Sequence, residues 1–271
     1  MDAAVEAWKF WRDERVLNAR APYGPLSLTG TYWLDELRPN SRALPGRWSV
    51  VPRSGQAVRA AAVALTAARH DGVTVDDVPL DGTVRLHPAD GAEGPDAPRI
   101  GHGGRRLELI VREGRHAVRV FDPASRARSG FAGIDAFPYD PDWVLPAQFA
   151  PFAADRTVRV PHSDGRKRPT VLAGTLTFSR GSTGCRVEVR RAADGALTVS
   201  LVDATRTAQE RGFRVVEIPA PDGTGTTLVD FNRAQLPPSA FAEHYLCPLP
   251  SAGNTLPFPV RAGERRLLER A

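Results

Sequence analysis

The sequence predicts a mainly β protein: an antiparallel sheet closed into a barrel or stacked as a sandwich, with an N-terminal helix and a long irregular C-terminal segment. Short runs that alternate apolar and polar residues recur from residue 48 onward, and Gly, Pro or Asp bounds each run. Tight-turn dipeptides separate several of these runs. Helical patterns of about ten to fifteen residues between the runs, which a βαβ fold would need, are missing from the sequence.

The N-terminal helix is predicted over residues 1–17. Val5, Trp8, Trp11 and Val16 fall near one face at spacings close to the helical repeat of about 3.6 residues. An amphipathic pattern of this kind indicates a helix that packs one face against the core.

The strongest hairpin signals lie between alternating runs. Glu113-Gly114 joins two such runs, and the turn sequences 192–195 and 221–223 do the same further along the chain. Repeated short strands joined in this way favour an antiparallel sheet over a parallel one.

Length and composition predict one domain over residues 1–271. The chain has 271 residues, of which 42% are hydrophobic and 25% are charged, the usual balance for a globular protein. No apolar run approaches the length of about 18–20 residues that crosses a bilayer, and the N-terminus has no signal-peptide pattern. Cys185 and Cys247 are too few for a disulfide scaffold and are predicted to be reduced. We therefore expect a cytoplasmic protein with no membrane partner.

The net charge of +5 and the pI near 9.7 raise the question of nucleic-acid binding. Only Lys9 and Lys167 are lysines, and the arginines are scattered along the chain. No basic stripe with interleaved aromatic residues and no nucleic-acid-binding motif is present in the sequence. We therefore predict no nucleic-acid partner.

Three motifs, found in order along the chain, carry a resemblance to a known family. They are WRDER with GTYWLDE, RVFDPAS…FAGIDAFPYDPDW, and VDFNRAQLPPSAF…CPLPSAGNTLPFPVRAGE. Together they resemble the DUF1684 family, a bacterial domain of unknown function, from about residue 7 to residue 264. The resemblance implies a single cytoplasmic domain and no established reaction. Family members commonly have cysteine where this chain has Ser239, so no mechanism of this chain requires a cysteine there.

The irregular segment 229–264 contains the leading candidate site, the Asp-Phe-Asn-Arg tetrad of residues 230–233. If the preceding strand continued through the tetrad, Asp230 and Asn232 would share one face and Arg233 would lie on the other. These side chains could bind a polar ligand or orient a water, and they could equally fasten the proline-rich segment through turn-type hydrogen bonds. Arg233 paired with a carboxylate such as Asp203 or Glu264 would be a structural ion pair or a substrate clamp.

His244 completes the predicted catalytic set of Asp230, Asn232 and Arg233, because it follows Ser239 within the same segment. A Ser239, His244 and Asp230 triad has the required residue types, although no Gly-x-Ser-x-Gly elbow is present. Further polar and aromatic residues are predicted to contribute to binding. These are Asp122, Trp143, Asp203, Arg214 and Asn254.

No metal site and no cofactor are predicted. The six histidines have no metal-ligand spacing, and the central aspartates fit no calcium loop. Gly101-His102-Gly103-Gly104 is interpreted as a loop and not as a phosphate cradle, because no helical pattern follows it.

Two functions of different class fit these observations. The first is a small-molecule enzyme, a hydrolase or isomerase without a nucleotide cofactor, whose pocket surrounds the tetrad. The alternative is a noncatalytic β-rich ligand-binding or scaffold domain in which the same residues only fix the chain. The burial of the tetrad distinguishes these two functions. If its side chains are hydrogen-bonded to the backbone and closed to solvent, the noncatalytic function is favoured. If they converge with Asp203 or Arg214 on an open cavity, the enzyme is favoured.

Overall fold

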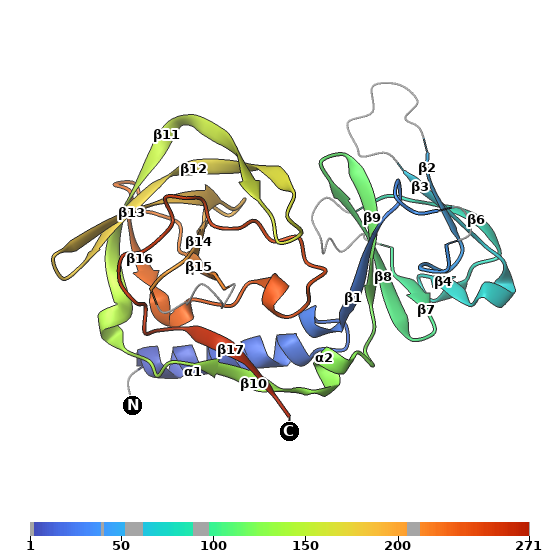
Figure 1. Ribbon diagram of the computed structural model, residues 1–271, viewed down its shortest axis with the longest axis horizontal. Helices are drawn as coiled ribbons and strands as arrows, with labels where there is room; N and C mark the ends of the chain where they lie inside the picture. The colour runs from blue at the N-terminus through green and yellow to red at the C-terminus, as the bar shows by residue number, and fades with distance from the viewer. Residues whose placement is uncertain (1–2, 39–40, 52–61, 89–97, 205–211, 271) are drawn as a thin grey trace. The chain divides into compact units, whose positions relative to one another are not determined.

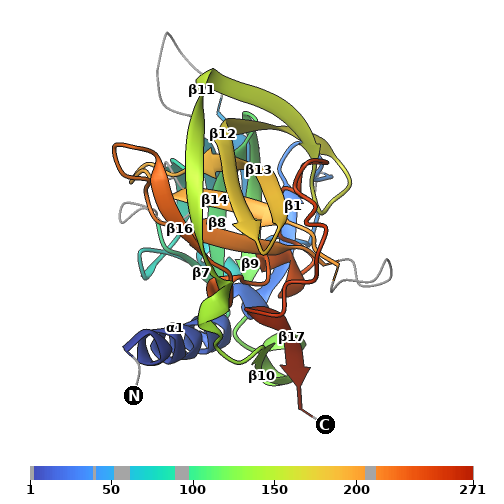
Figure 2. The same ribbon diagram turned by 90° about the vertical axis from the view of Figure 1, so that its left-hand side faces the viewer.

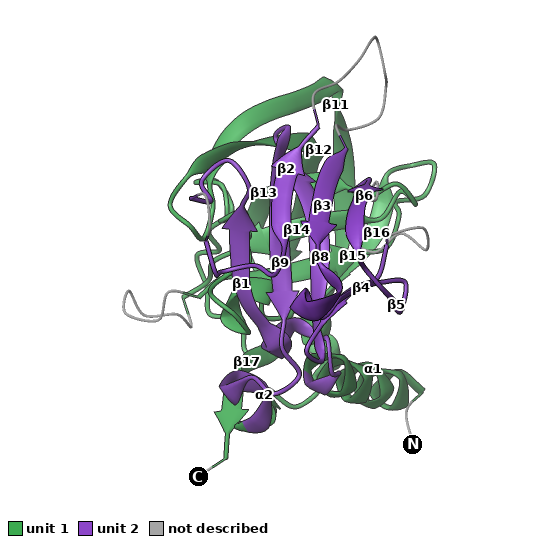
Figure 3. Ribbon diagram, turned by 90° about the vertical axis from the view of Figure 1, so that its right-hand side faces the viewer, with its two compact units in different colours: residues 1–19, 130–271 green, residues 20–129 purple. Residues whose placement is uncertain are grey.

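The computed structural model describes residues 3–38, 41–51, 62–88, 98–204 and 212–270, and it confirms a mainly β fold (Figure 1). Every pair of neighbouring strands in its sheets is antiparallel. The chain divides into two compact units, unit 1 (Met1–Ala19 and Gly130–Ala271) and unit 2 (Arg20–Ser129), coloured separately in Figure 3. That residues 1–271 form one domain stays a prediction. Within the described ranges, no helix combines the length and apolar character needed to span a membrane.

The predicted N-terminal helix is confirmed as α1 (Ala3–Arg20) and is longer than expected. It continues to Arg20 because the first strong helix breaker is Pro22, which also disfavours helical geometry at the residue before it. The buried face carries Trp8 and Ala19, and the indole N–H of Trp8 donates to the carbonyl of Asn232 at 3.0 Å. The helix is thereby tied to the tetrad within unit 1.

The main sheet of unit 1 has six strands in the order β15-β14-β13-β12-β11-β16 and curves into a half-barrel (Figure 2). Alternation along its strands turns one set of side chains inward, as Cys185, Val187 and Val189 of β13 show. The strands are β11 (Val144–Pro161), β12 (Lys167–Arg180), β13 (Thr183–Arg191), β14 (Leu197–Leu201), β15 (Arg214–Ile218) and β16 (Thr226–Asp230).

The rest of unit 1 consists of short elements and the irregular segment. A two-stranded ribbon pairs β10 (Phe131–Ala136) with β17 (Glu264–Glu269). Between β16 and β17 the chain forms only isolated bridges and two short 3-10 helices, η4 (Phe231–Arg233) and η5 (Pro238–Ala240), so the predicted irregular segment is confirmed. A third 3-10 turn, η3 (Pro141–Trp143), precedes β11.

Unit 2 contains two antiparallel sheets around its own apolar core, which includes Leu65, Ile100, Leu107 and Val118. The larger sheet has the order β1-β9-β8-β7-β4-β5 and the smaller one the order β2-β3-β6. The strands are β1 (Leu28–Trp33), β2 (Arg47–Val50), β3 (Val63–Ala67), β4 (Val73–Val75), β5 (Val78–Pro79), β6 (Gly82–Leu86), β7 (Ile100–His102), β8 (Arg105–Arg112) and β9 (Arg115–Phe121). The short helices are η1 (Pro25–Ser27), η2 (Arg69–Asp71) and α2 (Arg126–Ser129).

Two tight hairpins define the centre of the larger sheet. The predicted turn at Glu113-Gly114 joins β8 to β9, and both residues have positive φ, 54° and 75°. Gly103 and Gly104, with φ of 55° and 79°, join β7 to β8 in the same way. Residues 101–104 were expected to form a loop, and the structure corrects this: they end one strand and turn into the next. Glycine has no Cβ and adopts the left-handed conformation at no steric cost, which explains the pair.

Candidate functional site

The tetrad caps the end of β16 and does not extend the strand. The strand ends at Asp230, whose side chain accepts the N–H of Asn232 at 2.9 Å and so caps η4. The two-face alternation expected through Arg233 therefore does not apply. Arg233 is partly exposed (42% of its side chain), with its Nε 3.5 Å from the Asp230 carboxylate.

Asn232 is fully buried and bonded at both ends of its side-chain amide. Its Oδ1 accepts the N–H of Asp140 at 3.0 Å, and its Nδ2 donates to the carbonyl of Asp140 at 2.9 Å. The side chain thus replaces a strand partner for one residue of the loop before η3. Since this loop leads into β11, Asn232 links the end of β16 to the start of its neighbour.

Asp203 and Arg214 form a buried ion pair, with side chains 1% and 2% exposed. Arg214 also donates to the carbonyls of Ala262 and Val260, and Asp203 accepts the N–H of Val260 at 3.1 Å. The pair fastens the irregular segment at residues 260–262. Asp203, one of the two carboxylates expected for Arg233, is therefore paired with Arg214.

Glu264, the other expected partner of Arg233, pairs with Arg15 of α1. Nε and Nη2 of Arg15 lie 2.8 and 2.9 Å from the two carboxylate oxygens, a bidentate geometry. The same carboxylate accepts the N–H of Leu236 at 2.7 Å. Arg233 thus binds neither carboxylate that the sequence suggested.

Asn254 fastens the irregular segment to the half-barrel. Its Oδ1 accepts the N–H of Glu188 at 2.8 Å, and its Nδ2 donates to the carbonyls of Glu188 and Ser200 at 2.9 and 3.1 Å. Trp143 is buried against Phe231, with ring centroids 6.0 Å apart, under the guanidinium of Arg180.

The surroundings of His244 are more open. Its side chain is 36% exposed, and its Nε2 lies 3.9 Å from the carboxylate of Glu243. The backbone N–H of Ser239 donates to Sγ of Cys247 at 3.3 Å. A catalytic role for His244 stays a prediction.

The remaining predicted residue, Asp122, belongs to unit 2. One carboxylate oxygen accepts Nε–H of Arg105 at 2.9 Å, and the other accepts the N–H of Ala124 at 2.8 Å. Within unit 1, Asp203 and Arg214 meet each other and Asn254 lies at a different anchor point. Asp122 orients an arginine of unit 2.

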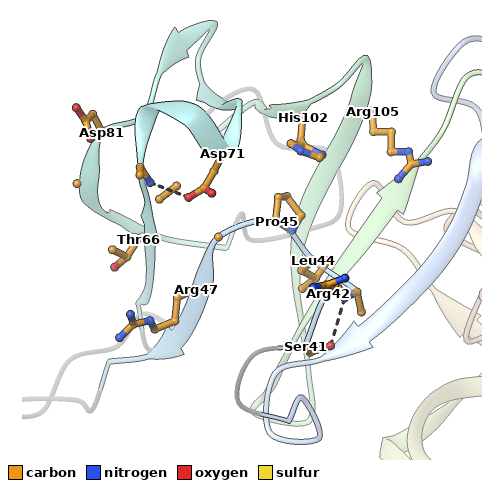
Figure 4. Close-up of a pocket in the computed structure, with 15 residues that line it drawn as sticks. Ser41, Arg42, Leu44, Pro45, Arg47, Thr66, Asp71, Asp81, His102 and Arg105 are labelled. Atoms are coloured by element: carbon orange, nitrogen blue, oxygen red, sulfur yellow. Dashed lines mark hydrogen bonds between the residues drawn. The ribbon is translucent and has the colours of Figure 1, made fainter.

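That arginine lines a hollow of about 760 Å³ within unit 2, drawn in Figure 4. His102 and Arg105 are direct partners across the β7–β8 pair, so their side chains share one face of the sheet. Figure 4 shows these two on one side of the hollow and Thr66 and Asp81 on the opposite side. Arg42, in the turn before β2, and Arg47, at its start, add two further guanidinium groups to the lining.

The lining of this hollow holds three arginines, one histidine and two carboxylates. Arg105 is also paired with Asp122, and the Asp71 carboxylate accepts the N–H of Ala68 at 2.8 Å. Arg42 and Arg47 form no ion pair with any residue in the described part of the chain. Sequence analysis missed this site because its residues are spread from 41 to 105. The sequence His102-Gly103-Gly104-Arg105 could have indicated part of this site, since a two-glycine turn places its flanking residues opposite each other.

Unit 1 has a hollow of about 690 Å³ across β11, β12, β13 and β16. Cys185 contributes to it, and burial raises the pKa of its thiol. A raised pKa keeps the thiol protonated at neutral pH, which makes it a poor nucleophile. Among the described residues, no three His, Cys, Asp or Glu side chains gather as a metal site.

The half-barrel, the tetrad and the C-terminal segment lie in a stretch of sequence that matches a known family. Residues 129–265 match the family described as "Protein of unknown function (DUF1684)", and the chain belongs to it. A solution NMR structure of an uncharacterized protein from Haloarcula marismortui is similar, with 29% identity over 50% of this chain and 77% of that one, at a TM-score of 0.40. No curated protein matches the chain.

Proposed function

We propose that this protein is a noncatalytic β-rich protein that binds a small molecule in the hollow of unit 2. The observation that carries this proposal is the burial and internal bonding of four predicted site residues of unit 1. Asn232, Arg214, Asp203 and Asn254 are all at most 3% exposed and are bonded to backbone groups of their own unit. Among the polar atoms of these four side chains, Nε of Arg214 is buried without a hydrogen-bond partner in the described part of the chain.

A group that binds or transforms a ligand must present a polar atom to it. Both ends of the Asn232 amide are occupied by Asp140, so contact with a substrate would break two buried hydrogen bonds. Each buried polar group left without a partner costs about 1–3 kcal/mol. The motif residues are therefore better suited to holding the chain than to chemistry.

The hollow has the opposite character. Its volume falls within the range of about 300–1,000 Å³ that is typical of ligand sites. Its lining combines the apolar side chains of Leu44 and Pro45 with polar groups that the fold leaves available, including Arg42. These properties support a binding role.

The alternative is a cofactor-free hydrolase or isomerase centred on Asp230, Arg233 and His244, which are all partly exposed. It predicts that Asp230→Asn abolishes turnover of a substrate without changing ligand affinity in unit 2.

A thermal-shift screen of small metabolites against the intact protein tests the binding proposal. We expect hits whose shifts are lost in variants of the hollow, such as Arg42→Gln, and kept in Arg233→Gln of the tetrad. Hits lost only in tetrad variants would contradict the proposal and favour the enzyme.

A further inference from the structure

We infer that the ligand of the unit 2 hollow carries an anionic oxygen group, a carboxylate or a phosphate, bound by Arg42 and Arg105 beside His102. This inference rests on the proposed binding function and adds the chemical class of the ligand. It is carried by the placement of cationic side chains around one hollow and by the available donors of these arginines.

The β7–β8 hairpin fixes two of these side chains. Because Gly103 and Gly104 form a two-residue turn, His102 and Arg105 face each other as the first pair of the ladder. Directly opposite side chains have Cβ atoms about 5 Å apart. The hairpin therefore places an imidazole and a guanidinium on the same face of the sheet, where both can donate hydrogen bonds to one oxyanion.

Asp122 holds Arg105 without using all of its donors. Its carboxylate accepts Nε–H at 2.9 Å, which leaves the terminal nitrogens of the guanidinium for a ligand. A guanidinium presents its donors in a planar fork that matches carboxylate and phosphate oxygens. Asp122 is thus a positioning residue for Arg105.

Arg42 supplies an uncompensated charge. It lies in the turn between β1 and β2, and no residue in the described part of unit 2 forms an ion pair with it. The composition agrees: residues 20–129 contain 16 arginines and 12 aspartates and glutamates. A surplus of positive charge attracts anionic ligands and strengthens their binding at low ionic strength.

The Asp71 carboxylate is bonded within the η2 turn. It accepts the N–H of Ala68 and lies 3.7 Å from Nε2 of His70. Asp81 lies across the hollow from His102 and Arg105 (Figure 4). The side that carries His102 and Arg105 is therefore the side where an oxyanion would be bound.

Isothermal titration of the full chain with inorganic phosphate and with malonate, in a buffer free of other polyvalent anions and with glycerol as a neutral probe, tests the inference. We expect saturable binding of at least one anion, weakened by added salt. Arg42→Gln and Arg105→Gln should each weaken it about tenfold, the equivalent of one charge-assisted hydrogen bond.

Arg85→Gln is the matched control, because Arg85 is an exposed arginine of β6 outside the lining. It should leave anion affinity unchanged. Asp122→Asn should weaken binding in the native protein and have no further effect once Arg105 is glutamine. If Asp122→Asn only destabilised the fold, its effect on anion affinity would not depend on whether Arg105 is present.

The outcomes separate the two proposals. If screened neutral compounds bind the hollow while phosphate and malonate do not, the anion inference is wrong and the binding function stands. If anions bind but Arg85→Gln weakens them as much as Arg42→Gln does, the binding is diffuse and the inference is also wrong. If no compound of either kind binds, both proposals fail.

Discussion

The two units use their polar side chains in opposite ways. In unit 1 the motif side chains are directed at the backbone: Asn232 binds both backbone polar groups of Asp140, and Arg214 binds Asp203 and two carbonyls. In unit 2 the arginines around the hollow are exposed, and Arg42 and Arg47 form no ion pair within the described residues. The difference separates residues that specify a fold from residues that are available to a ligand.

This comparison changes what family membership implies. The family match covers residues 129–265, which lie almost entirely in unit 1, whereas the lining of the hollow extends from residue 41 to residue 105. The family motif therefore describes how the half-barrel is closed. The proposed ligand site lies in the part of the chain that the family match does not include.

The largest expected effect comes from the buried ion pair of unit 1. Arg214→Met should lower the free energy of unfolding by about 3–5 kcal/mol, because it leaves the Asp203 carboxylate buried and unpaired. Urea denaturation followed by circular dichroism measures this. Asp203→Asn combined with Arg214→Met should recover part of the loss, since no charge then stays buried. Equal loss in the single and double variants would contradict this explanation.

The tetrad should show an intermediate effect confined to one residue. Asn232→Ala removes both hydrogen bonds to Asp140 and should lower the unfolding free energy by about 2–3 kcal/mol. Arg233 is the next residue of the same turn, but it is partly exposed and its Nε lies 3.5 Å from the Asp230 carboxylate. Arg233→Gln should therefore change the unfolding free energy by less than about 1 kcal/mol. Chemical denaturation of both variants measures these losses. A larger loss in Arg233→Gln than in Asn232→Ala would show that Asn232 does not stabilise the fold in this way.

The smallest expected effect is a pH dependence in the hairpin between β11 and β12. The Arg168 guanidinium holds the pKa of Asp164 below its usual value. A lowered folded-state pKa contributes stability above the unfolded-state pKa of about 3.9, and this contribution is lost as pH falls through the folded value. Asp164→Asn should therefore cost about 1 kcal/mol or less near neutral pH and still less near pH 2.5. An equal cost at both pH values would exclude this charge effect.

The sequence predicted the features that depend on local pattern. The α1 periodicity, the Glu113-Gly114 turn and the irregular segment before Glu264 are all present. Each depends on residues close in sequence, where spacing and turn chemistry determine the backbone. One of the two interpretations of the tetrad was that it fastens the proline-rich segment, and the hydrogen bonds of Asn232 agree with that interpretation.

The hollow could not be predicted, because contacts between distant residues create it. Arg42 and Arg105 are brought to one hollow by the order of two sheets, which alternation alone does not determine. Asp122 was predicted as a binding residue, and its hydrogen bond with Arg105 depends on β8 lying beside β9. The His102-to-Arg105 turn was visible in the sequence, but its two glycines suggested only a loop.

The most direct test measures the phosphate affinity of two variants, Asn232→Ala in unit 1 and Arg42→Gln in unit 2. Each is titrated with phosphate at a temperature where the variant is folded. We predict that Asn232→Ala keeps the native phosphate affinity despite its lower stability, and that Arg42→Gln loses about tenfold in affinity at native stability. If Asn232→Ala abolishes binding while Arg42→Gln preserves it, the division between a structural unit 1 and a ligand-binding unit 2 is wrong.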